Sequence, residues 1–159
     1  RGGGERTPKP RRAIARAIEG PGSLRANLVV TTGRAVGAER FGVQPPHVII
    51  ENYIPHGLLL PLCDLVVSPG GAGTVVGALG HGLPQLMLVS QHDTPAHAAG
   101  PAGAQAGLVL DGPEATPQRI ASTAQRLLSD PSFAAAARRV RVEMAAMPSA
   151  SSVLATLTI

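Results

Sequence analysis

The sequence has 159 residues, enough for one domain built around one hydrophobic core. Apolar residues make up 44% of the chain and aromatic residues only 2%, so Leu, Val, Ile and Ala must form most of that core. No stretch approaches the roughly 20 apolar residues of a membrane-spanning helix, which argues against a membrane span. The single cysteine, Cys63, excludes an internal disulfide, and we therefore expect a cytoplasmic protein.

The net charge of +4 is distributed unevenly. Residues 1–40 contain nine Lys or Arg and three acidic residues, whereas residues 41–118 contain no Lys or Arg, five acidic residues and all five histidines. We interpret the basic amino-terminal segment as a solvated tail and helix face. Nucleic-acid binding is not indicated, because the sequence has no interleaved aromatic residues, zinc-finger spacing or recognition-helix pattern.

The first two thirds of the chain alternate between apolar runs and turn residues. Ile14 and Ile18 are four residues apart, as on one helix face, and Gly20-Pro21-Gly22 ends that pattern. Short apolar runs bounded by turn residues are typical of buried strands. In chain order we predict a disordered tail (1–8), a helix (10–19), a strand (27–32), a loop (35–46), a strand (47–53), a short helix (55–62), a strand (64–68), a helix (73–81) and strands (84–89 and 107–110).

The last third contains two helix starts of the same kind. Thr116-Pro117 and Asp130-Pro131 each combine a favourable N-cap residue with proline at the first helical position. Two apolar stripes at helical spacing follow, and Pro148 separates them from a last apolar stretch over 153–157. The first stripe is Ile120, Ala124, Leu127 and Leu128, and the second is Phe133, Ala137, Val140 and Met144.

Strands that alternate with helices predict an α/β protein with a Rossmann-like parallel sheet and helices on both faces. Crossover connections in such a sheet are right-handed. The sequence contains no internal repeat and no linker, so we expect residues 9–159 to form one domain after the tail. Ligands of such folds bind at the carboxyl ends of the strands.

The stretch Ser-Pro-Gly-Gly-Ala-Gly, residues 68–73, lies where a predicted strand gives way to a helix. Helix amino termini have unpaired N–H groups and a partial positive charge, and therefore attract phosphate. Glycines let a ligand approach the backbone, and Thr74 adds a hydroxyl donor. Because residues 41–118 lack Lys and Arg, backbone amides, the helix dipole and histidine would have to neutralise a diphosphate here unless another segment reaches over the site. The glycines alone are equally compatible with a tight turn that binds nothing.

The wider pattern resembles the carboxyl-terminal, donor-binding domain of GT-B glycosyltransferases of the erythromycin-glycosyltransferase-like type, in the UDP-glycosyltransferase superfamily. That family's loop reads His-Gly-Gly-x-Gly-Thr and is followed by Ala-Leu-x-x-Gly-x-Pro-Gln. The matching residues here are Gly70, Gly71, Gly73, Thr74, Ala78, Leu79, Gly82, Pro84 and Gln85. The stretches "NYIPHGLLLPLCDLVV" and "QHDTPAHAA" are similar to neighbouring family motifs, and the resemblance covers about residues 23–147.

The resemblance implies a domain that binds a nucleoside-diphosphate sugar for inverting, hexosyltransferase-type transfer to a hydroxyl group of a small natural-product acceptor, as in antibiotic biosynthesis. The glycine loop would hold the diphosphate, Tyr53 and Ile54 would lie along the base, and Asp93 would accept hydrogen bonds from the sugar. It implies no cofactor besides the donor substrate and no metal, because the loop itself would stabilise the leaving diphosphate. The candidate nucleotide-sugar-binding residues are Gly33, Tyr53, Ile54, His56, Ser68, Gly70, Gly71, Ala72, Gly73, Thr74, Asp93 and Thr94.

Several positions depart from the family pattern. The loop histidine that usually donates to the diphosphate is Pro69, which has no donor. His56 and Thr94 occupy positions where the family usually has glutamine, and His97 occupies a position where it usually has asparagine. The usual Ala-Arg-Val continuation is Ala-Gly-Pro over residues 99–101, which we expect to shorten that helix. These changes predict weaker donor binding, an unusual donor or a relaxed function.

Family members also carry an acceptor domain that supplies the catalytic base, and a Leu-Gly-Thr strand before the first helix. These 159 residues contain neither, so we expect the acceptor domain to be missing or on another chain. We assign no catalytic residue in this chain and expect no transfer activity from it alone. His47 and His81 are interpreted as structural residues and Cys63 as a core residue, and no spacing of His, Cys and Asp predicts a metal site.

Two alternatives stay open at this point. Gly71-x-Gly73 precedes Asp93 by about 20 residues, as in a nicotinamide-dinucleotide-binding domain, but Val76 occupies the third glycine position and two strands come before the loop. The chain could also be a non-catalytic subunit that binds a nucleotide sugar, or a decayed fragment of a gene.

Overall fold

The computed structural model describes residues 9–33, 36–89 and 95–157. The tail over 1–8 and the candidate residues Asp93 and Thr94 lie outside these ranges. The first half consists of α1 (Lys9–Glu19), η1 (Pro21–Ser23), β1 (Leu28–Thr31), η2 (Ala38–Phe41), β2 (Val48–Glu51), α2 (His56–Leu59), η3 (Leu60–Leu62) and β3 (Val66–Ser68). The second half consists of α3 (Ala72–Gly80), β4 (Gln85–Val89), α4 (Pro95–Gly103), β5 (Gly107–Asp111), α5 (Pro117–Ser129), α6 (Pro131–Ala145) and α7 (Ala150–Leu157).

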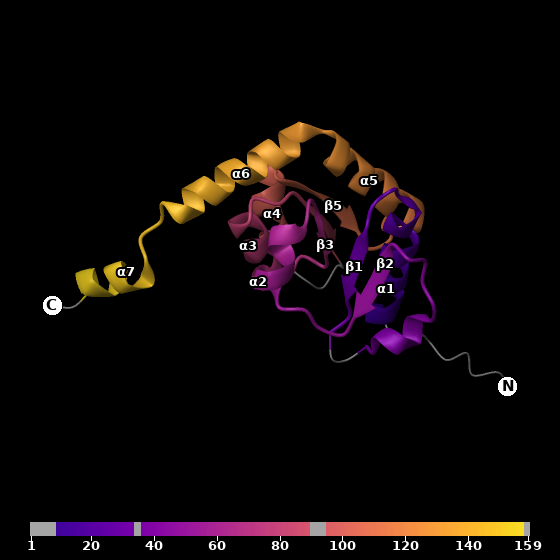
Figure 1. The fold of residues 1–159 in the computed structure, drawn as a ribbon. Coiled ribbons are helices and arrows are strands. Elements are labelled where there is room, and N and C mark those ends of the chain that lie inside the picture. Colours follow the sequence, from indigo (N-terminus) through magenta and orange to yellow (C-terminus); the bar gives the residue numbers. More distant parts are fainter. Residues whose placement is uncertain (1–8, 34–35, 90–94, 158–159) are drawn as a thin grey trace.

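Each predicted strand and helix is confirmed to within a few residues, and η2 falls inside the predicted loop. The carboxyl-terminal part of α6 and all of α7 extend away from the strands (Figure 1). Within the described ranges, none of the helices has the length and apolar character that crossing a membrane requires.

The strands form two hydrogen-bonded groups, which differs from the single sheet that we expected. In one group β1 pairs in parallel with β2, with Val29 opposite Ile49. In the other, β4 lies between β3 and β5 and is parallel to both. Figure 1 shows β1 between β2 and the three-stranded sheet, yet no ladder joins the two groups within the described residues. The apolar runs predict strands, but they do not determine which strands become neighbours.

Helices cover both faces of the three-stranded sheet, as predicted. Leu86 lies in a core cluster with Ile120, Ala124 and Leu127 of α5, whereas its neighbour Met87 lies in a second cluster with Val75 of α3. Successive residues of a strand point to opposite faces, so this alternation places α5 on one face and α3 on the other. Leu128 does not belong to the buried stripe of α5 and is 41% exposed, because α5 meets the core along one narrow side.

The predicted helix starts are confirmed by their hydrogen bonds. Thr116 Oγ1 accepts from the Arg119 N–H at 3.2 Å, and Asp130 Oδ1 accepts from the Ser132 N–H at 3.0 Å. Hydrogen bonds from the side chain and backbone of Ser132 lower the pKa of Asp130. Both caps satisfy donors that a helix leaves unpaired at its amino terminus.

Pro101 does not end the helix in which it lies. Helix α4 continues through Pro101 to Gly103. Proline has a φ close to that of a helix, so its main cost is the lost hydrogen bond to the carbonyl of residue 97 and crowding against that turn. The Pro101 side chain is fully buried, and this apolar burial offsets part of the cost.

Contacts between α1 and α5 connect the two strand groups. Gly20 is buried where α1 ends, and a Cβ placed on it would lie 2.5 Å from the Pro117 carbonyl oxygen and 3.3 Å from Ile120 Cβ. Arg16 Nη1 donates to the carbonyls of Gly112 and Ala115 at 3.4 and 3.5 Å. Close helix packing at Gly20 therefore helps to hold β1 and β2 in place, where no ladder among the described residues does so.

This contact predicts that Gly20→Ala destabilises the chain. The added methyl group meets backbone atoms of α5 that cannot rotate away, so we expect urea unfolding to report a loss of about 1–3 kcal/mol. Gly22→Ala is the matched control, because its Cβ would lie 3.9 Å from Val48, an ordinary contact distance. Equal stability of the two variants would contradict the proposed role of Gly20.

Candidate functional site

The loop between β3 and α3 is organised by Ser68 and Gly70. The Ser68 side chain is buried, and its Oγ accepts a hydrogen bond from the Gly70 N–H at 3.1 Å. Gly70 has a φ of +85°, in the left-handed region that favours glycine. Gly71 then serves as the N-cap residue of α3. Gly70 is thus required by the path of the backbone.

Gly71 and Gly73 have no such requirement. Gly71 has φ −62° and ψ 136°, which other residues adopt easily, and Gly73 lies in the first turn of α3. No described residue lies within 4 Å of a Cβ placed on either one. Glycine inside a helix costs about 1 kcal/mol relative to alanine, so Gly73 is unfavourable for folding. The absence of side chains here leaves the backbone of the first turn open from outside.

The first turn of α3 has unpaired hydrogen-bond donors. The first bond of the helix runs from the Val75 N–H to the Gly71 carbonyl at 3.0 Å. Within the described part of the chain, no partner is found for the N–H groups of Ala72, Gly73 and Thr74, and Gly71 makes no side-chain cap. Ala72 and Gly73 are exposed and Thr74 is half-buried. These donors and the helix dipole can bind an anion.

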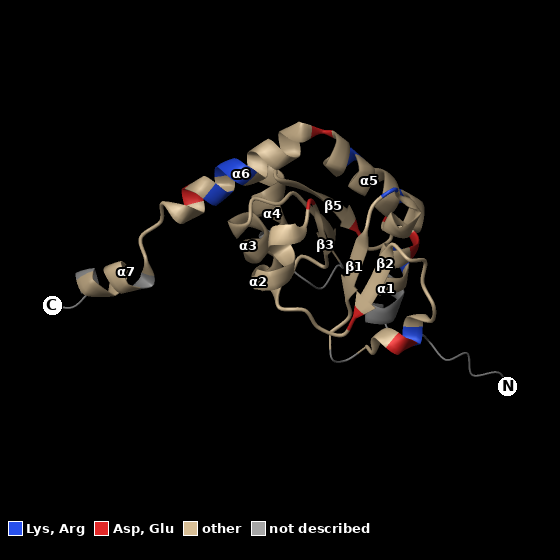
Figure 2. Cartoon of the chain, in the orientation of Figure 1, with Lys and Arg blue, Asp and Glu red and all other residues tan. Residues whose placement is uncertain are grey.

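The part of the sequence that contains the glycine loop has no Lys or Arg side chain. Lys and Arg are absent from residues 41–118, and Figure 2 shows α2, α3 and α4 without any blue residue. Pro69, which occupies the position of the family's loop histidine, is exposed and supplies neither a backbone nor a side-chain donor. From residues 41–118, an anion at this loop would be held by amides, hydroxyl groups and histidine side chains.

Asn52 links the loops that follow β1 and β2. Its carbonyl accepts from the Gly33 N–H at 2.9 Å, and its Oδ1 accepts from the Ala38 N–H at 2.8 Å. Gly33 has a φ of +73°, and the next residue after Asn52 is Tyr53, which is 70% exposed. Sequence reasoning missed Asn52, although an asparagine directly after a strand is a common turn residue.

The segment after β2 packs against α3. A Cβ placed on Gly77 would lie 3.4 Å from Leu60 Cδ1 and 4.0 Å from His56 Nδ1. Gly77 is three residues after Thr74, so α2 places His56 on the side of α3 that also carries Thr74. Figure 1 shows α2 beside α3. The structure therefore brings His56 close to the helix of the glycine loop, with Tyr53 and Ile54 just before it in the chain.

The remaining histidines that can be described, and the cysteine, have structural contacts. His47 Nε2 lies 2.9 Å from the Gly22 carbonyl oxygen, and His81 Nδ1 lies 2.8 Å from that of Gly77. Cys63 Sγ donates to the Leu59 carbonyl at 3.3 Å, and burial, together with Asp64, raises the pKa of its thiol. A protonated thiol is a poor nucleophile, which agrees with a core role. Among the described residues, no group of three or more His, Cys, Asp or Glu could hold a metal ion.

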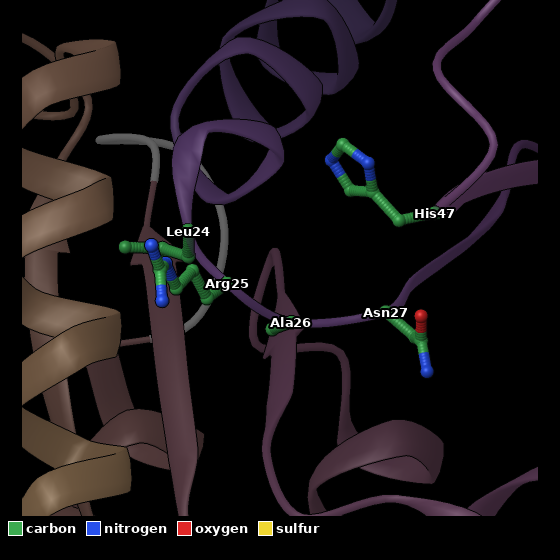
Figure 3. A pocket seen from close by; sticks show the side chains of 5 residues that line it. All are labelled: Leu24, Arg25, Ala26, Asn27 and His47. Atoms are coloured by element: carbon green, nitrogen blue, oxygen red, sulfur yellow. The ribbon is translucent and has the colours of Figure 1, made fainter.

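A pocket of about 400 Å³ lies away from the glycine loop, where the chain enters β1 and β2. It is lined by Leu24, Arg25, Ala26, Asn27 and His47. Figure 3 shows that these side chains point in different directions, and His47 already contacts the Gly22 carbonyl. The pocket has no convergent set of polar groups, so we do not assign it as the binding site.

Parallel strands covered by helices on both faces, with a glycine loop that opens a helix, are typical of a Rossmann-like α/β domain that binds a nucleotide, the class to which each half of a GT-B glycosyltransferase belongs. Residues 16–158 match the family model described as "Erythromycin biosynthesis protein CIII-like, C-terminal domain". The chain belongs to this family.

Relatives and solved structures agree with this assignment. The chain is 34% identical over 140 residues to the 10-deoxymethynolide desosaminyltransferase of Streptomyces venezuelae, a match that covers 88% of this chain and 33% of the relative. It is 34% identical to the elloramycin glycosyltransferase ElmGT of Streptomyces olivaceus, covering 97% of this chain and 42% of the relative. The structure of the spinosyn rhamnosyltransferase SpnG complexed with thymidine diphosphate superimposes with a TM-score of 0.82 at 29% identity, covering 92% of this chain and 40% of that one. The chain thus spans about a third to two fifths of the length of these proteins.

The different roles of the loop glycines predict opposite effects on stability. Gly70→Ala places a Cβ at positive φ, and we expect it to destabilise the chain by about 1–2 kcal/mol. Gly73→Ala improves helix propensity in open space, and we expect an increase of up to about 1 kcal/mol. Urea unfolding measures both. A loss of stability in Gly73→Ala would show that the fold itself requires that glycine.

Proposed function

We propose that this chain is the donor-binding domain of an inverting glycosyltransferase. It binds a nucleoside-diphosphate sugar and presents the anomeric carbon to a hydroxyl group of a small natural-product acceptor. The observation that carries the proposal is the pair Gly71 and Gly73, which the fold does not need and which expose the unpaired amides of α3. A ligand that touches the backbone is a physical reason for both glycines.

The diphosphate is held by the N–H groups of Ala72, Gly73 and Thr74, with the Thr74 hydroxyl as a further donor. When the sugar leaves, negative charge develops on the diphosphate, and these fixed donors stabilise it without a metal ion. Ser68 occupies the Gly70 N–H, so that amide is not a phosphate ligand in this arrangement. The acidic segment 41–118 makes these backbone donors the main positive feature that this part of the sequence offers.

The other candidate residues bind the nucleoside and the sugar in this proposal. Tyr53 stacks on the base, Ile54 contacts it through its backbone, and Gly33 lies beside the nucleotide. His56 donates to the phosphate or sugar, and Asp93 and Thr94 bind the sugar hydroxyls. Support comes from the exposure of Tyr53, from the packing of α2 against α3, and from the thymidine diphosphate in the SpnG structure.

The acceptor site and the catalytic base belong to polypeptide outside this sequence, either in the same enzyme or on another chain. The relatives support this proposal, since this chain spans only 33% and 42% of two of them. In the second case this chain is a non-catalytic, nucleotide-sugar-binding subunit, and the separate chain provides the acceptor site and the base. The single cysteine supports a reducing, cytoplasmic setting for the enzyme.

Gly71→Asp tests the assignment of the loop. Aspartate is a favourable N-cap residue, so we expect the variant to fold at least as stably as the native chain. Its carboxylate would lie against the diphosphate, and charges at about 4 Å repel by about 1–4 kcal/mol per pair, so we expect at least a 100-fold loss of affinity for thymidine diphosphate by calorimetry.

Gly71→Asn is the matched control, because asparagine has nearly the same shape and also caps helices but carries no charge. It should lose much less affinity than Gly71→Asp. Equal affinities of the two variants would count against a diphosphate at this loop. The same titration with NADH tests the dinucleotide alternative, and a preference for NADH over thymidine or uridine diphosphate would overturn the proposed donor.

We also predict that the purified 159-residue chain binds a nucleoside diphosphate but transfers no sugar. The physical reason is that the acceptor hydroxyl must be activated by a general base positioned beside it, and in our proposal that base lies outside residues 1–159. Product formation from thymidine-diphosphate sugars and macrolide or anthracycline acceptors, followed by mass spectrometry, measures this. Turnover by the chain alone would place the base within residues 1–159.

A further inference from the structure

Gln85 is a polar residue in an otherwise apolar row beneath α3. It is the first residue of β4, and its side chain is fully buried. Alternation along the strand places Gln85 on the same face as Met87 and Val89, which pack with Val75 of α3 and Ala98 of α4. An aliphatic side chain is the ordinary choice for such a position.

The Gln85 amide makes one hydrogen bond to the first turn of α3. Its Nε2 donates to the Val75 carbonyl oxygen at 3.1 Å, and the Val75 side chain is also buried. Its Oε1 is buried and has no partner among the described residues. Reversing the amide would direct Oε1 at the Val75 carbonyl, so the hydrogen bond determines its orientation.

This arrangement is a poor device for stability. A buried polar atom without a partner costs more stability than one ordinary hydrogen bond contributes. A methionine of similar length would fill the same space with neither an unpaired buried oxygen nor a hydrogen bond. Local features that disfavour folding are expected where function requires them.

We infer that Gln85 is a positioning residue of the donor site, which fixes the first turn of α3 relative to β4 so that its free amides meet the diphosphate. This inference rests on the proposed function. Val75 directly follows Thr74, the last residue with an unpaired N–H in that turn. Apolar packing of Val75 against Met87 is non-directional and allows the helix to shift, whereas a hydrogen bond fixes both distance and orientation.

The test compares Gln85→Met with Met87→Leu, a volume-conserving change in the same row of the same strand. For Gln85→Met we expect unfolding stability equal to or above that of the native chain. We expect its affinity for thymidine diphosphate to fall about 2- to 10-fold, the equivalent of one hydrogen bond. Met87→Leu should leave that affinity unchanged.

Thymidine, which lacks phosphate, separates positioning from general damage. Gln85→Met should bind thymidine as the native chain does, because the base contacts lie on other elements. Hydrogen exchange of the Val75 amide, which donates to the Gly71 carbonyl, should accelerate in the variant. Gln85→Leu provides a second apolar replacement should Gln85→Met fold poorly, and the same pattern is expected of it.

Two results would overturn the inference while leaving the proposed function intact. One is native affinity for thymidine diphosphate in Gln85→Met. The other is a variant that is less stable and that loses affinity for thymidine and for thymidine diphosphate to the same extent. If the native chain itself bound no nucleoside diphosphate, the proposed function and the role of Gln85 would fail together.

Discussion

The close approach of α1 to α5 is the contact on which the arrangement of the site depends. β1 and β2 share no ladder with the three-stranded sheet among the described residues, so packing sets their position, through Gly20 and the hydrogen bonds of Arg16 on one side and through Leu60 against α3 on the other. The loops that carry Gly33 and Tyr53 follow β1 and β2, whereas the glycine loop follows β3. A shift between the two strand groups would therefore separate the nucleoside side of the proposed site from its phosphate side.

Residues 41–118 contain no Lys or Arg, so the groups that they offer to a diphosphate at the glycine loop are mainly fixed dipoles. Amides at the start of a helix are already oriented, so binding requires no reorganisation of flexible side chains. Their weakness is that a small displacement of the helix weakens all of them together. Pro69 increases this dependence, because it removes the donor that the family's histidine would add.

Several features that disfavour folding lie around the first turn of α3. Gly73 reduces helix propensity, Gln85 leaves a buried oxygen without a partner among the described residues, and three amides there have no intrahelical acceptor. Other parts of the chain follow the ordinary rules, with capped starts of α5 and α6 and apolar rows in β4 and β5, although Pro101 inside α4 is an exception. This local contrast is the pattern expected when ligand binding, and not stability, determines the choice of residues.

Periodicity, caps and glycine spacing determined much of this protein in advance: the order of strands and helices, the parallel α/β class, and the loop from Ser68 to Thr74. These features depend on residues close together in sequence, where sterics and hydrogen-bonding capacity act locally. Only the tertiary structure decided the division of the strands into two groups, the passage of α4 through Pro101, the hydrogen bonds of Asn52 and the bond from Gln85 to Val75. Each of these depends on which distant segments meet, and an apolar run or a single glutamine carries no information about its partner across the fold.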